Sequence, residues 1–209
     1  LIQRPRNSLS ERADRVLLVS PAIELTRVAA LAEVIEILAV VPLPVLDKAR
    51  WQEIAPEFDP YKFNSFPVNA SRQINRATRA LQRSLQEAQR AGRLAQMPPV
   101  VTWQSVVDST VGSDGVANRL FARLQGTQHR LVLFDINRLP ELRGVARPAA
   151  RALIERLATG PRGYALDIVS NADTRTSRIG VWRLAPDGRR QDLPTALDWP
   201  ASLVSLGHV

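Results

Sequence analysis

The chain has 209 residues, of which 45% are hydrophobic and 23% charged, so it can bury one sizeable core and is not expected to be disordered. It has no cysteine, which excludes disulfides, thiolate metal sites and a cysteine nucleophile. The net charge is +8 and comes almost entirely from arginine, since Lys48 and Lys62 are the only lysines. The arginines are spread along the whole chain, which favours a solvated surface over specific nucleic-acid binding.

The first predicted elements are a strand and a helix. Residues 16–19 form a short apolar run closed by a serine and a proline, which predicts a buried strand. Residues 23–41 have the spacing of an amphipathic helix. Charged residues and prolines interrupt the apolar stretch 28–45, so it does not predict a membrane span. The sequence starts on Leu1 without a signal peptide, and we expect it to be a piece of a longer protein.

Residues 42–68 form a long segment that is rich in proline and aromatic residues. A segment of this length inside a compact domain is often a lid or a binding loop. A packed surface loop whose aromatic side chains cover the core fits the sequence equally well. The candidate substrate-binding residues of this segment are Trp51, Phe58, Tyr61, Phe63 and Phe66.

The clearest predicted helix follows, with Asn69 as its N-cap and Gly92 near its C-terminal end. Arginines at positions 72, 76, 79, 83 and 90 fall away from its apolar face. Such a stripe can bind anionic lipid, although it is more often the hydrated side of a packed helix.

Short buried strands are predicted over 100–103 and 131–134, with a helix over 115–124 between them. Strands that alternate with helices are typical of parallel sheets. We therefore expect an α/β fold of three layers, with a mostly parallel sheet and helices on both of its faces. Further on, the pattern predicts a helix over 148–158, strands over 164–169 and 179–184, and a last apolar run over 203–206.

Two histidines and two aspartates are the candidates for catalytic chemistry. Sites of parallel α/β sheets form beyond the carboxyl ends of the strands. His208 follows an apolar run and Asp108 and Asp135 follow predicted strands, whereas His129 precedes one. By position, His208 is the candidate proton shuttle, and either aspartate could orient it.

Other kinds of site find no support in the sequence. Scattered acids and two distant histidines do not make a metal site, and no phosphate loop or dinucleotide motif indicates a cofactor. The chain also has no Gly-x-Ser-x-Gly turn. Ser20 lacks the flanking glycines of that turn, so we expect it to be structural.

Four segments resemble the α/β-hydrolase superfamily, in particular its serine-aminopeptidase-like and lysophospholipase-like members: residues 16–22, 58–67, 99–111 and 205–209. Residues 99–111, PVVTWQSVVDSTV, are similar to the strand and loop that carry the acid of the catalytic triad, with Asp108 at its position. The terminal SLGHV is similar to the segment with the triad histidine, which falls on His208. Gln104 and Ser105 stand where the family commonly has His-Gly, and the histidine comes about 70 residues later than usual, so an insertion is needed.

The resemblance implies an incomplete hydrolase core that lacks its nucleophile. Its parts would be a core strand and helix (1–41), a lid (42–96), a core strand-helix-strand unit with the acid (97–135), an insertion (136–201) and a terminal segment with the histidine (202–209). The parent protein would cleave carboxylic esters of small molecules or lipids, and this piece alone would be inactive. No cofactor is implied, and a cytoplasmic location is slightly favoured.

A second hypothesis is a non-enzymatic binding module that uses its basic surface to contact nucleic acid or an anionic membrane. Affinity for DNA or anionic vesicles that collapses with added salt would distinguish it from the hydrolase.

Overall fold

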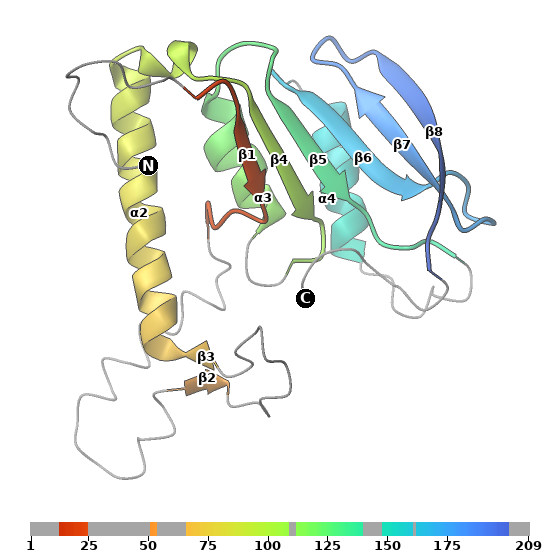
Figure 1. Ribbon diagram of the computed structural model, residues 1–209, viewed down its shortest axis with the longest axis horizontal. Coiled ribbons are helices and arrows are strands. Elements are labelled where there is room, and N and C mark those ends of the chain that lie inside the picture. The colour runs from red at the N-terminus through yellow and green to blue at the C-terminus, as the bar shows by residue number, and fades with distance from the viewer. Residues whose placement is uncertain are drawn as a thin grey trace.

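The computed structural model describes residues 13–24, 51–53, 66–108, 112–139, 148–160 and 162–200 (Figure 1). The strands are β1 (Val16–Val19), β2 (Trp51–Glu53), β3 (Phe66–Pro67), β4 (Val100–Ser105), β5 (Arg130–Phe134), β6 (Ala165–Asn171), β7 (Arg178–Leu184) and β8 (Arg190–Asp198). The helices are α2 (Val68–Arg90), the 3₁₀ turn η2 (Arg93–Gln96), α3 (Ser113–Gly115) with its π-helical and 3₁₀ continuations η3 (Val116–Leu120) and η4 (Phe121–Arg123), and α4 (Pro148–Thr159).

Six strands form one mixed sheet in the order β1-β4-β5-β6-β7-β8. The pairs β1–β4, β4–β5 and β5–β6 are parallel, whereas β6–β7 and β7–β8 are antiparallel. The expectation of a mostly parallel α/β sheet is therefore wrong for the C-terminal part of the sheet. The connections 172–177 and 185–189 are the physical reason, because a parallel crossover needs a dozen or more residues.

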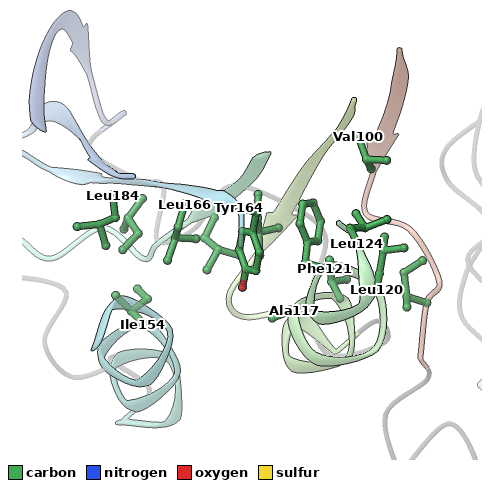
Figure 2. Close-up of a cluster of buried hydrophobic side chains, with 14 of the residues drawn as sticks. Val100, Ala117, Leu120, Phe121, Leu124, Ile154, Tyr164, Leu166 and Leu184 are labelled. Carbon is green, nitrogen blue, oxygen red and sulfur yellow. The ribbon is translucent and has the colours of Figure 1, made fainter. Parts of the chain in front are cut away.

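The three-layer arrangement is also wrong, since the helices that cover the sheet lie on one face of it. Strands β1, β4, β5 and β6 are neighbours in the order in which they occur along the chain. Right-handed crossovers between strands in such an order place every connecting helix on the same side. Figure 2 shows Ala117 and Leu120 from η3 and Ile154 from α4 below the same face of the sheet. No helix of the described residues lines the opposite face.

The core lies between this helical layer and the middle strands. Leu131 and Leu133 from β5 and Leu166 and Ile168 from β6 are almost completely buried. Phe121 packs against Tyr164 with the ring centroids 4.8 Å apart (Figure 2). Burial of one such side chain contributes about 1.5–3 kcal/mol, so this cluster holds the helices against the sheet.

The opposite side of the sheet is called the open face here. Each strand contributes one aliphatic side chain to it: Leu17, Val101, Val132, Val169, Val181 and Leu193. Near its middle Asp167 forms a two-point ion pair with Arg183, with Nε–Oδ1 and Nη2–Oδ2 distances of 2.9 and 2.8 Å. The hydrogen bonds to Asp167 raise the pKa of Arg183. At the β1 edge, Leu17 is 60% and Val19 76% exposed, so this end of the open face is apolar and accessible.

Helix α2 lies beside the β1 edge of the sheet (Figure 1). Leu85 on its inner face is buried in the core, and Gln82 donates from Nε2 to the carbonyl oxygen of Ile23 at 3.1 Å. The helix begins at Val68, so Asn69 is inside it rather than at its N-cap. Gly92 adopts φ 65° just after its end, as expected for a glycine that stops a helix. Among the described helices, none has the length and hydropathy to cross a membrane.

Several predicted elements can be compared with the structure. The apolar runs expected to be strands became β1, β4 and β5, and the predicted helix over 148–158 is α4. The predicted strands over 164–169 and 179–184 are β6 and β7, while β8 was not predicted. Most of the helix expected over 23–41 and all of the apolar run 203–206 lie outside the described residues.

Candidate functional site

The parallel strands place polar side chains at one edge of the sheet, where β4, β5 and β6 end. Asp108 follows β4, Asp135 directly follows β5, and Ser170 and Asn171 are the last two residues of β6. Because the carboxyl ends of parallel strands meet at a common edge, these side chains share one region of the molecule. This carboxyl edge is the candidate site.

Asp108 sits in a tight turn that continues from β4. Its backbone N–H donates to the carbonyl oxygen of Ser105 at 3.4 Å, and Val106 donates its N–H to the carbonyl oxygen of Phe134 at 3.0 Å. The Ser113 hydroxyl also donates to the Ser105 carbonyl oxygen, at 2.6 Å. The turn is thus fixed to both the neighbouring strand and the start of α3, which limits where the Asp108 carboxylate can lie.

The side chain of Gln104 orients that carboxylate. Gln104 is only 1% exposed, and its Nε2 donates to Oδ2 of Asp108 at 3.2 Å. Asp108 itself is half-buried, so a carboxylate held by a buried amide remains partly accessible. Gln104 was noted in the sequence only as a departure from a His-Gly pair, and its role could not be recognised without the turn geometry.

Asp135 has a different environment, because its carboxylate is fully buried and occupied by internal donors. Oδ1 accepts from the Ile136 N–H at 2.8 Å and from Arg138 Nη2 at 2.9 Å. Oδ2 accepts from Arg138 Nε at 2.5 Å and from the Ser170 hydroxyl at 2.7 Å. Four hydrogen bonds use the accepting capacity of the two oxygens, which indicates that Asp135 ties β5 to β6 rather than serving a second group.

Two asparagines extend this network along the same edge. The amide of Asn171 donates to Oδ1 of Asn137 at 3.0 Å and to the carbonyl oxygen of Thr176 at 2.9 Å. Oδ1 of Asn171 accepts from the Arg138 N–H at 2.7 Å. The sequence signal for these residues was weak: polar side chains that follow apolar strands, separated by more than 30 positions.

The two histidines differ in what the structure describes. His129 is buried at the start of β5, where its Nδ1 accepts from the Val100 N–H at 3.1 Å and its Nε2 faces the Gln125 carbonyl oxygen at 3.0 Å. Both ring nitrogens are therefore used inside the fold, at the end of the strands opposite to the carboxyl edge. His208 lies outside the described residues, so its distance from Asp108 is not given by the structure.

The aromatic candidates are only partly described. The backbones of Trp51 and Phe66 belong to the small antiparallel sheet β2–β3, in which Trp51 pairs with Pro67 and Glu53 with Phe66. This sheet leads directly into α2. The other candidates, Phe58, Tyr61 and Phe63, lie outside the described residues.

The edge offers one partly accessible carboxylate, a buried amide that holds it, and a neighbouring carboxylate that is saturated. The described residues contain no group of three or more histidine, aspartate or glutamate side chains that could hold a metal ion. A half-buried carboxylate that a buried amide holds in place can orient a proton-carrying group. No protein-family model matches this chain, and comparisons with curated proteins and with solved structures find no match either.

Proposed function

We propose that this chain supplies the acid and the histidine of a Ser–His–Asp hydrolase that cleaves carboxylic esters with acyl groups. In this proposal Asp108 is the acid and His208 the general base. The serine belongs to a segment that this sequence does not contain.

The observation that carries the proposal is the contrast between the two aspartates at the carboxyl edge. Asp135 has no accepting capacity left, because Arg138, Ser170 and the Ile136 N–H use both of its oxygens. Asp108 is half-buried and is held at Oδ2 by Gln104. A triad acid must be held in place and lie close enough to the surface for an imidazole from another segment to reach it, and the half-buried Asp108 meets this condition better than the fully buried Asp135.

The antiparallel part of the sheet does not affect the edge at which Asp108 lies. A triad acid depends on the parallel strands that end at the same edge, and β1, β4, β5 and β6 are parallel neighbours. The antiparallel strands β7 and β8 extend the far side of the sheet and do not alter the turn that holds Asp108.

The proposed chemistry proceeds in two balanced steps. In the first, His208 takes the proton of the serine hydroxyl while the serine oxygen attacks the ester carbonyl. The histidine then gives this proton to the departing alcohol, which leaves the acyl group on the serine. In the second, water attacks the acyl-enzyme with the same proton transfers, which releases the carboxylic acid and restores the serine. Asp108 holds the imidazole and stabilises its charged form in both steps. The aromatic segment 51–66 is proposed to contact the acyl group.

The histidine titration of the complete chain tests the proposal without the serine. The chain has only two histidines, so NMR can follow the ring nitrogens of His208 with His129 as an internal reference. Replacement of Asp108 by Asn should lower the pKa of His208, because a nearby carboxylate favours the charged imidazole. The Asp173→Asn variant, which changes an exposed aspartate in the β6–β7 connection, is the matched control.

The result also separates the two candidate acids. A shift of His208 in Asp135→Asn but not in Asp108→Asn would assign the acid to Asp135 and overturn the proposal for Asp108. No shift in either variant would remove the triad. The chain alone should not hydrolyse a nitrophenyl ester, and turnover that His208→Ala abolishes would show that the nucleophile is inside this sequence.

A further inference from the structure

The outer face of α2 carries a straight line of arginines. They occupy positions 72, 76, 79, 83 and 90, and these intervals return to the same side of a helix at almost every turn. Leu85, Asn75 and Thr78 on the other side of the helix are buried. Arg76, Arg83 and Arg90 are exposed, and Arg72 is half-buried. The five residues Arg72, Arg76, Arg79, Arg83 and Arg90 are called the arginine stripe below.

Charge is not balanced along this helix. Of the 23 residues of α2, five are arginine and only Glu87 is acidic. Helix α2 thus holds a surplus of four positive charges, which is half of the net charge of the chain.

Several exposed arginines elsewhere pair with an aspartate two positions away in the sequence. Arg175 pairs with Asp173, Arg189 with Asp187 and Arg190 with Asp192. In the described part of the chain, Arg76, Arg83 and Arg90 are found in no such pair. These three side chains can therefore neutralise an external anionic surface without giving up an internal ion pair.

We propose that the arginine stripe is a docking surface for an anionic lipid bilayer. The exposed charges from Arg76 to Arg90 lie along one side of the helix over about 21 Å, so they can meet a flat surface together. The apolar side of α2 is used by the core, so the contact is electrostatic and needs no insertion into the acyl chains. Nucleic acid is less well matched, because α2 has no aromatic side chain on which a base could stack.

Co-sedimentation of the complete chain with lipid vesicles tests this proposal. The probes are vesicles of phosphatidylcholine alone and vesicles with phosphatidylglycerol added. We expect binding only to the second kind, and a loss of binding as salt is added, since screening weakens contacts between exposed charges. The variant R76Q/R83Q/R90Q should bind roughly a hundredfold more weakly, because each arginine at an anionic surface contributes about fivefold in affinity.

The matched control is R175Q/R189Q/R190Q, which removes the same number of charges from the β6–β7 and β7–β8 connections and from β8. It should change binding only severalfold, because an adjacent aspartate already offsets each of these arginines. Glutamine has a helix propensity close to that of arginine, and circular dichroism of both variants checks that α2 is intact.

Four results would overturn the proposal. Equal binding to neutral and anionic vesicles would indicate adsorption through the apolar open face. Equal losses of vesicle binding in both triple variants would indicate that the net charge of the chain, rather than the arginine stripe, is responsible for binding. Binding of a labelled DNA duplex, but not of anionic vesicles, through the same three arginines would assign the stripe to nucleic acid. Absence of binding to anionic vesicles at low salt would remove the site.

Discussion

Asp135 and Arg138 form a two-point ion pair between a fully buried carboxylate and a half-buried guanidinium, with Arg138 Nε 2.5 Å from Oδ2 and Nη2 2.9 Å from Oδ1 of the carboxylate. Asp135 has no exposed surface, and the Ser170 hydroxyl completes its partners from the next strand. The pair therefore compensates a charge that would otherwise be buried alone, and it fixes the carboxyl ends of β5 and β6 beside the Asp108 turn.

The Arg138→Ala variant should lose about 3–5 kcal/mol of unfolding free energy, because it leaves the buried Asp135 carboxylate without its counter-ion. Urea denaturation at neutral pH measures the loss. The control is Arg151→Ala, which removes an exposed ion pair to Glu155 on α4 and should cost far less, because water screens exposed charges. Similar losses of unfolding free energy in the two variants would mean that Arg138 is not needed to compensate the charge of Asp135. The assignment of Asp135 as a structural carboxylate would then be wrong.

His129 should prove to be a structural residue that joins β4 to β5. Its Nδ1 accepts from the Val100 N–H, so the proton of the neutral ring lies on Nε2 and is donated to the Gln125 carbonyl oxygen. His129→Phe retains a ring but leaves the buried Val100 N–H without its acceptor, which should cost about 1–3 kcal/mol. The loss is measured by thermal or urea unfolding, and NMR of the ring nitrogens at neutral pH should show the Nε2–H tautomer. A Nδ1–H tautomer would contradict this hydrogen-bond pattern.

The strands were predictable where a short run of apolar side chains is bounded by turn residues. Leu131 to Phe134 of β5 and the first residues of β4 lie in the middle of the sheet, so their composition alone indicates a strand. β8 escaped prediction because it is an edge strand with charged residues and Pro194, and an edge is where a sheet tolerates proline.

The layer arrangement could not be obtained from alternating strands and helices. It depends on the order of strands in the sheet, and pairing partners are set by contacts distant in the sequence. Connection lengths did hold information, since the residues between β6 and β7 are too few for a crossover and require an antiparallel pair.

For the candidate site, the positions of Asp108 and Asp135 after predicted strands place both residues at one edge of the sheet. These positions do not show which of the two carboxylates is buried and which is partly accessible. The difference between them arises from Ser170, which is 35 positions from Asp135, and from the conformation of the Arg138 side chain. The same limit applies to His129, whose partner Val100 is 29 positions away. Such contacts have no local sequence signature.

Tyr164 should make the protein less stable at alkaline pH. Burial raises its pKa above the ordinary value of 10.0, an effect that the nearby Arg162 charge only partly opposes. The folded state therefore keeps the phenolic proton at a pH where the unfolded chain has lost it, and stability falls as pH rises from the unfolded pKa through the folded one. Below pH about 10 this group does not change stability with pH.

Urea midpoints between pH 8 and pH 11.5 measure this effect. Tyr164→Phe removes the ionisable group and should flatten the part of the decline above pH about 10. Tyr61→Phe changes the other tyrosine of the chain and is the control for general alkaline effects. Parallel declines in the wild type and Tyr164→Phe would show that burial of Tyr164 does not contribute.

The open face should make the isolated chain self-associate. Leu17 and Val19 expose apolar side chains on β1, which is an edge strand with its other side unpaired among the described strands. Exposed apolar surface beside a free strand edge is a common cause of association. The double variant Leu17→Thr/Val19→Thr places β-branched side chains suited to a strand at both positions while it lowers the apolar area, so it should shift the chain toward monomer in sedimentation velocity. The control is Leu197→Thr, because Leu197 on β8 is exposed to a similar degree at the opposite edge of the sheet. A wild-type chain that remains monomeric at high concentration would mean that the open face is covered in solution. Equal effects of the two variants on self-association would mean that both edges of the sheet, and not β1 alone, form the contact between chains.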